Sequence, residues 1–155
     1  MRTLALAVII GFSFLGVASA EQDDPPAPCG PAAQLPAELS NNVGADARCF
    51  EIRMYTARPP EDGKGGIDEL HQRFREGEVA IFEKHGAEIV AVWQNLDNPN
   101  RLVWMLAYRD RAHREEVWAG FRDDPEWHEL RAKYPAPLEG IDVFMLSSSD
   151  YSNLK

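Results

Sequence analysis

Three stretches of this 155-residue chain have the length of β-strands, yet each is apolar on both of its faces. They are residues 88–94, 101–109 and 140–147. In the second stretch, Leu102 and Trp104 fall on one face, while Val103 and Met105 fall on the other. An antiparallel sheet with one face in water alternates apolar with polar residues instead. A sheet built from these strands therefore needs cover on both faces.

A further strand, predicted over residues 49–56, has a different pattern. Its side chains divide into an apolar face and a polar face: Phe50, Ile52 and Met54 against Glu51, Arg53 and Tyr55. The polar face belongs to the same sheet as the apolar strands. Its surroundings therefore depend on what covers that sheet.

Helical regions separate the strands. Apolar residues recur at helical spacing over residues 67–85 and 111–122. Asp124 and Pro125 then start another short helix, with an N-cap residue followed by proline at the first helical position. The resulting order is βαββαβ, which is that of the ferredoxin-like fold. The predicted class is α+β, with an antiparallel sheet that carries helices on one face only.

The helices leave the second face of this sheet without cover. A second copy of the protein is the expected partner, joined through the open sheet faces in a barrel-like homodimer. We expect the polar face of residues 49–56 to point into that enclosed interior. Glu51 and Arg53 would then pair with each other as a structural element, or they would help to line a pocket for a small ligand.

The N-terminus has the parts of a secretory signal peptide, predicted over residues 1–20. Arg2 precedes an apolar run over residues 4–17, and small residues stand before an acidic segment. An uncleaved membrane anchor is the alternative, but the run is short for a span, which takes about 20 residues. We therefore predict export to a periplasmic or extracellular location.

Three segments are predicted after the signal peptide. They are a proline-rich disordered leader (21–48), the α+β domain (49–147) and a polar tail (148–155). The leader contains Cys29, and the domain begins at Cys49. In an oxidising compartment these cysteines are expected to form a disulfide that ties the leader to the first strand. The alternative is two unpaired thiols.

The net charge of −9 argues against two classes of partner. Nucleic acids and anionic membrane surfaces both require clustered positive charge, so neither is expected to bind. The sequence contains no metal-ligand spacing, phosphate loop or dinucleotide fingerprint, and we predict neither a metal nor a cofactor. His85 stands at the C-terminal end of its helix, where a positive charge interacts favourably with the helix dipole. We therefore expect it to cap the helix rather than to take part in catalysis.

Short stretches between Phe50 and Met145 form a joint signature. They are EIRMYT (51–56), FEKHG (82–86), VW (92–93), NRLV (100–103), LAYRD (106–110) and FRDDPEW (121–127). Together they resemble the NIPSNAP domain family. The resemblance implies a dimeric α+β barrel, which agrees with the need to cover the sheet, and it implies no catalytic set. Many members have a proline near the position of Ala80, so its absence here predicts a straighter first helix.

These features favour a homodimeric module that binds a small apolar or aromatic ligand, or a partner, through an enclosed apolar pocket. A few polar groups in an apolar wall are the usual form of such a site. The predicted pocket residues are Arg53, Tyr55, Trp93 and Trp104.

The alternative is an enzyme of the cofactor-independent monooxygenase or isomerase kind, which is suggested by fold analogy alone. Arg53 would then hold or polarise a substrate oxygen, and Glu51 or His71 would move a proton. Tyr55 is the remaining catalytic candidate. The sequence leaves the choice between a binding module and an enzyme open.

Overall fold

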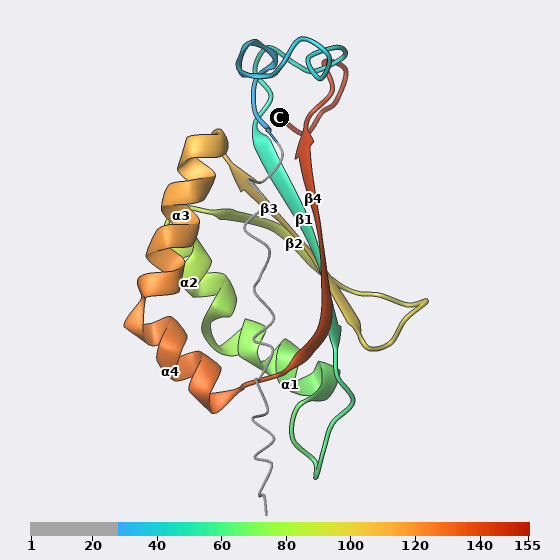
Figure 1. The fold of residues 1–155 in the computed structure, drawn as a ribbon, viewed down its shortest axis with the longest axis vertical. Helices are drawn as coiled ribbons and strands as arrows, with labels where there is room; N and C mark the ends of the chain where they lie inside the picture. The colour runs from blue at the N-terminus through green and yellow to red at the C-terminus, as the bar shows by residue number, and fades with distance from the viewer. Residues whose placement is uncertain (1–27) are drawn as a thin grey trace, which may run out of the picture.

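The computed structural model describes residues 28–155, and the predicted signal peptide lies outside them (Figure 1). The elements are η1 (Ala32–Gln34), β1 (Cys49–Ala57), α1 (Gly66–Arg73), the π-helical turn η2 (Phe74–Glu78), α2 (Val79–Lys84), β2 (Glu88–Gln94), β3 (Arg101–Tyr108), α3 (Arg111–Asp123), α4 (Pro125–Lys133) and β4 (Leu138–Ser147). The predicted strands and helices are present close to their expected bounds. No helix in this part of the chain is long and apolar enough to cross a membrane.

The strands form one antiparallel sheet in the order β2-β3-β1-β4. Helices α1 to α4 lie against one face of it, and none of the described helices covers the opposite face (Figure 1). The chain therefore has the predicted α+β class and the βαββαβ order of the ferredoxin-like fold. β1 and β3 are the central strands, and β2 and β4 are the edges.

β1 presents its polar side chains to the helices, which is the opposite of the prediction. In the register of β1 with β3, Arg53 lies opposite Trp104 and Tyr55 lies opposite Leu102, so these side chains share a face. Trp104 and Leu102 are completely buried, and Phe74 of η2 packs edge-on against Trp104. The alternation of β1 identified which residues share a face, but it carried no information on which face the helices cover.

The first helix is bent rather than straight. α1 and α2 are joined by η2, in which Gly77 has non-helical backbone angles. Gly77 also lets α4 approach, because a Cβ at this position would lie 3.0 Å from Leu130 Cδ2. The straighter helix expected from the absence of a proline near Ala80 is therefore wrong. A π turn bends a helix without any proline.

Two of the signature stretches meet where α2 ends and α4 begins. His85 Nε2 lies 2.7 Å from Asp124 Oδ2, and Lys84 Nζ lies 2.9 Å from the same oxygen. Asp124 also caps α4 by accepting a hydrogen bond from the amide of Glu126. His85 thus joins two helices, in addition to its place at a helix end.

Gly120 of α3 leaves room for the His85 ring, because a Cβ at Gly120 would lie only 2.5 Å from His85 Nδ1. We expect Gly120→Ala to lower the free energy of unfolding by roughly 1–3 kcal/mol through overpacking, despite the higher helix propensity of alanine. Urea denaturation measures the change. Gly140→Ala is the control, since a Cβ there meets open space. Equal losses in the two variants would contradict this interpretation.

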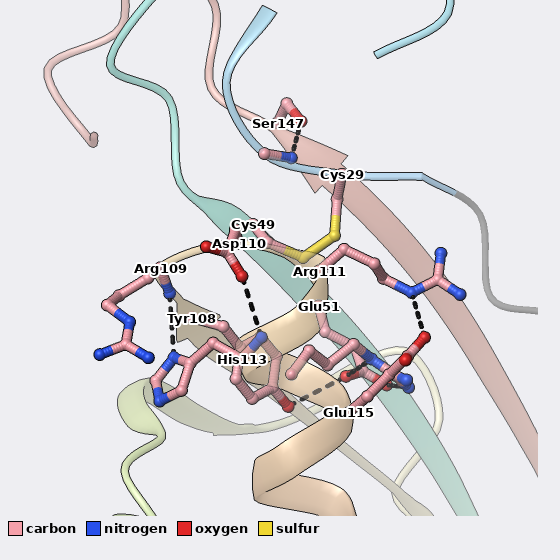
Figure 2. The surroundings of a disulfide bond; sticks show 12 residues. Cys29, Cys49, Glu51, Tyr108, Arg109, Asp110, Arg111, His113, Glu115 and Ser147 are labelled. Atoms are coloured by element: carbon pink, nitrogen blue, oxygen red, sulfur yellow. Dashed lines mark hydrogen bonds and ion pairs between the residues drawn. A yellow bond between two sulfur atoms is a disulfide. The ribbon is translucent and has the colours of Figure 1, made fainter. Parts of the chain in front are cut away.

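Residues 28–48 pack against the C-terminal tail, in contrast to the predicted disordered leader. The Cys29–Cys49 disulfide joins this segment to β1, as predicted (Figure 2). The amide of Gly30 donates to Ser147 Oγ at 2.8 Å, across 117 positions of sequence. Leader and tail together lie at one end of the sheet (Figure 1). Composition did not predict this order because the contacts that provide it are distant in sequence.

Candidate functional site

Glu51 is the centre of a buried ionic cluster between the sheet and α3. Its side chain is completely buried. Oε1 accepts hydrogen bonds from Arg53 Nη1 (2.7 Å) and Arg114 Nη2 (2.9 Å). Oε2 accepts from Arg114 Nε (2.8 Å), Tyr108 OH (3.0 Å; Figure 2) and Trp118 Nε1 (3.1 Å). These five residues are called the Glu51 cluster below, and their donors engage both carboxylate oxygens.

The donors keep Glu51 ionised. Burial disfavours the charged carboxylate, but the hydrogen bonds from Arg114 and the charges of Arg53 and Arg114 outweigh burial and lower the pKa of Glu51. Tyr55 shifts the other way, since burial raises its pKa to about 12 although Arg53 opposes the change. Glu51 is therefore charged with its lone pairs engaged, which makes it a poor acceptor for a substrate proton.

Arg53 is only partly engaged within the Glu51 cluster. Its Nη1 donates to Glu51, and its Nε donates to Tyr55 OH at 2.9 Å. Its guanidinium carbon lies 4.4 Å from the ring centroid of Trp118. Among residues 28–155, the remaining nitrogen, Nη2, has no hydrogen-bond acceptor, yet it is not one of the fully buried polar atoms that lack a partner. Solvent therefore reaches Nη2, although Arg53 as a whole is only 6% exposed.

A second buried ion pair lies between the sheet and the helices. Arg73 Nε is 2.7 Å from Glu78 Oε2, and both residues are buried. Burial raises the pKa of Glu78, and the hydrogen bond from Arg73 and the charges of Arg73 and Arg53 only partly offset this. The arginines of the two groups outnumber their glutamates by one. Because Arg114 holds Glu51 through two nitrogens, we assign the unbalanced positive charge to Arg53.

The edge strand β4 carries exposed apolar side chains on both faces, with Asp142 beside them on the open side. Val143 lies opposite Arg53 and Ile141 lies opposite Tyr55, so both side chains are on the helix side of the sheet. They remain 42% and 41% exposed. On the open side, Phe144 is 49% exposed. The helix layer therefore leaves β4 uncovered, and Val143 and Ile141 form an exposed apolar strip next to Arg53, called the β4 strip below.

The predicted pocket residues lie on opposite sides of the sheet. Arg53, Tyr55 and Trp104 are on the helix side, where the rings of Tyr55 and Trp104 have centroids 5.6 Å apart. Trp93 pairs with Val103 and is therefore on the open side, 46% exposed. The structure thus separates Trp93 from the other three.

The remaining catalytic candidate, His71, lies apart from the Glu51 cluster. Its Nε2 is 2.8 Å from Gln94 Oε1 of β2, the edge of the sheet opposite to β4. The proton-transfer candidates His71 and Glu51 are consequently not brought together. In the described part of the chain, no three or more His, Cys, Asp or Glu side chains are grouped so as to hold a metal ion.

Two surface hollows lie elsewhere on the molecule. One, of about 330 Å³, is lined by residues of η2, α2 and α4. The other, of about 510 Å³, lies between the β1–α1 connection and the end of α4. None of the predicted site residues lines either hollow.

Sequence reasoning missed three members of the Glu51 cluster: Tyr108, Arg114 and Trp118. Arg114 and Trp118 are one helical turn apart, which places them on the same face of α3. Trp118 belongs to the apolar residues that recur at helical spacing over residues 111–122, so an arginine four residues before it was a usable signal. The sequence, however, did not indicate that α3 packs against the polar face of β1.

The fold and the Glu51 cluster define a small α+β protein with ferredoxin-like topology and a buried ionic centre. The NIPSNAP family model matches residues 50–152. The chain belongs to the NIPSNAP family, as its signature stretches indicated. No curated protein matches the sequence.

Solved structures of NIPSNAP proteins share this fold. One from Agrobacterium tumefaciens, of unknown function, is 21% identical with a TM-score of 0.64, and the match covers 74% of this chain and 99% of that one. A second from the same organism is 19% identical with a TM-score of 0.60, covering 70% and 99%. An uncharacterised NIPSNAP-like domain protein from Burkholderia xenovorans is 24% identical with a TM-score of 0.59, covering 69% and 90%. At these identities the likeness shows the fold alone.

Proposed function

We propose that this protein is a homodimer that binds a small apolar ligand on the helix side of β4. One observation carries the proposal: β4 presents exposed apolar side chains on both faces. An exposed apolar surface of this kind marks an interaction site. Because the two faces of β4 point in opposite directions, each needs an occupant of its own.

The open side of β4 is the proposed dimer interface. It carries Phe144 and Leu146, which are 49% and 40% exposed, and Trp93 extends the same face at the other edge of the sheet. A second copy offers the same apolar face, which makes the contact self-complementary. Two sheets packed in this way form the dimeric α+β barrel that the family resemblance implies.

The helix side of β4 is the proposed ligand site. The β4 strip supplies an apolar wall, and Arg53 supplies the adjacent polar group. This combination is typical of small-molecule sites. It also replaces the pocket first predicted, which was placed inside the barrel between the two sheets.

We further propose that the protein acts outside the cytoplasm. The Cys29–Cys49 disulfide supports an oxidising compartment. The predicted signal peptide lies outside the described residues and remains a prediction. An enzymatic role likewise stays a prediction, since no geometry of the Glu51 cluster favours proton transfer.

Two substitutions at neighbouring positions of β4 test the proposal, because Val143 and Phe144 face opposite sides of the sheet. Phe144→Asp would place an unpaired charge in the interface, and we expect the dimer to weaken by about a hundredfold or more. Val143→Asp should leave the dimer intact and weaken, without abolishing, binding of the neutral apolar dye N-phenyl-1-naphthylamine. Light scattering measures the mass, and dye fluorescence measures binding.

Each variant serves as the control for the other. If Val143→Asp dissociated the dimer as strongly as Phe144→Asp, the two faces of β4 would not have separate roles. If wild-type protein bound no dye at a saturable site, the ligand proposal would fail.

A further inference from the structure

We propose that the ligand of the β4 site carries one anionic oxygen, which binds Nη2 of Arg53. This inference rests on the proposed ligand site. It adds the chemical class of the ligand: an apolar body with a single carboxylate or an equivalent monoanionic group.

The charge balance around Arg53 is the first argument. Within residues 28–155, the ion pairs of Arg53, Arg73 and Arg114 are made with two carboxylates, Glu51 and Glu78. Arg53 and Arg114 share the single negative charge of Glu51, and a buried charge that is only partly compensated attracts an anion.

The free donor of Arg53 is the second argument. Nη1 and Nε have acceptors in Glu51 and Tyr55, whereas Nη2 has none within residues 28–155. These two bonds also fix the orientation of the guanidinium, as does its stacking over Trp118. The unused donor is therefore held in place before any ligand binds, which lowers the entropic cost of binding.

The direction of access is the third argument. On the β3 side, Arg53 is flanked by Trp104, which is completely buried, and α3 places Trp118 over the guanidinium. On the β4 side its neighbour is Val143, which is 42% exposed. A ligand that approaches Arg53 from this side would therefore lie on the β4 strip. An apolar ring on the strip with a carboxylate toward Arg53 satisfies both the strip and the guanidinium.

A pair of matched probes tests the charge requirement. 2-Naphthoate and 2-naphthamide share an aromatic body and differ in the charge of one substituent. We expect wild-type protein to bind 2-naphthoate at least about tenfold more tightly, because hydrogen bonds between two charged groups are stronger than those to a neutral acceptor. Isothermal titration calorimetry measures both affinities on the full protein.

Two variants connect this preference to Arg53. Arg53→Met should reduce the affinity for 2-naphthoate to that for 2-naphthamide, while Arg75→Met, at an exposed arginine of η2, should leave both unchanged. Val143→Asp, compared with Val143→Asn, provides a second route that keeps the Glu51 cluster complete. The aspartate would compete for Nη2 and remove the preference for the acid, and the asparagine would not.

The outcomes separate this inference from the proposed function. Equal affinity of wild-type protein for the two probes would overturn the anionic ligand class and leave the apolar site standing. A preference for 2-naphthoate that survived both Arg53→Met and Val143→Asp would overturn the role of Arg53. Failure of both naphthalene probes and of the neutral dye to bind would refute the ligand site itself.

Discussion

Glu51→Gln is expected to lower the free energy of unfolding by about 3–5 kcal/mol, the range for removing one partner of a buried ion pair. The substitution leaves Arg53 and Arg114 without their shared counter-ion. In the wild type, Tyr108 and Trp118 donate hydrogen bonds to the Glu51 carboxylate. The glutamine side chain has an NH2 group in place of one carboxylate oxygen, so it cannot accept all of these bonds. Guanidinium denaturation monitored by circular dichroism measures the loss.

Glu115→Gln is the matched control for Glu51→Gln. Glu115 pairs with Arg111 four residues away on α3, and its side chain is 59% exposed (Figure 2). Exposed pairs of this kind contribute only about 0.3–0.5 kcal/mol. If the two substitutions had similar effects, the Glu51 cluster would not be the structural centre that its geometry indicates.

The double variant Cys29→Ala, Cys49→Ala is expected to be less stable than the wild type by about 3 kcal/mol, the chain-entropy value for a closed loop of this length. The bond spans 20 residues and ties residues 28–48 to β1. Chemical denaturation with and without dithiothreitol measures the effect. The reductant should lower the stability of the wild type to that of the double variant.

The same substitution should loosen one end of the molecule before the rest. The amides of Gly30 and Gly44 donate hydrogen bonds to Ser147 Oγ and Ser148 O. Without the disulfide, these hydrogen bonds should open more often. Hydrogen exchange at these amides should accelerate, while the centre of β3 stays protected. If reductant left the stability of the wild type unchanged, the disulfide would not stabilise the fold.

The sequence was sufficient for the elements and their order. Period-two and period-3.6 patterns act over neighbouring residues, so they can be read without any tertiary information. The apolar character of both faces of residues 140–147 also revealed a surface that needs cover, and the structure leaves β4 exposed on both faces.

The orientation of β1 could not be obtained in the same way. A polar face was taken to avoid the helix-covered core, yet Glu51 is buried there because Arg114, 63 positions away, reaches it from α3. The close approach of Leu130 from α4 to Gly77 was missed for a similar reason, since the two residues are distant in sequence. Local sequence patterns do not show which distant residues will be in contact.

Sedimentation equilibrium of the wild-type protein tests whether a second copy covers the open face of the sheet. We predict a species of twice the chain mass that persists on dilution through the micromolar range. A single species with the mass of one chain at every concentration would contradict it, since Trp93, Phe144 and Leu146 would then face water without a partner.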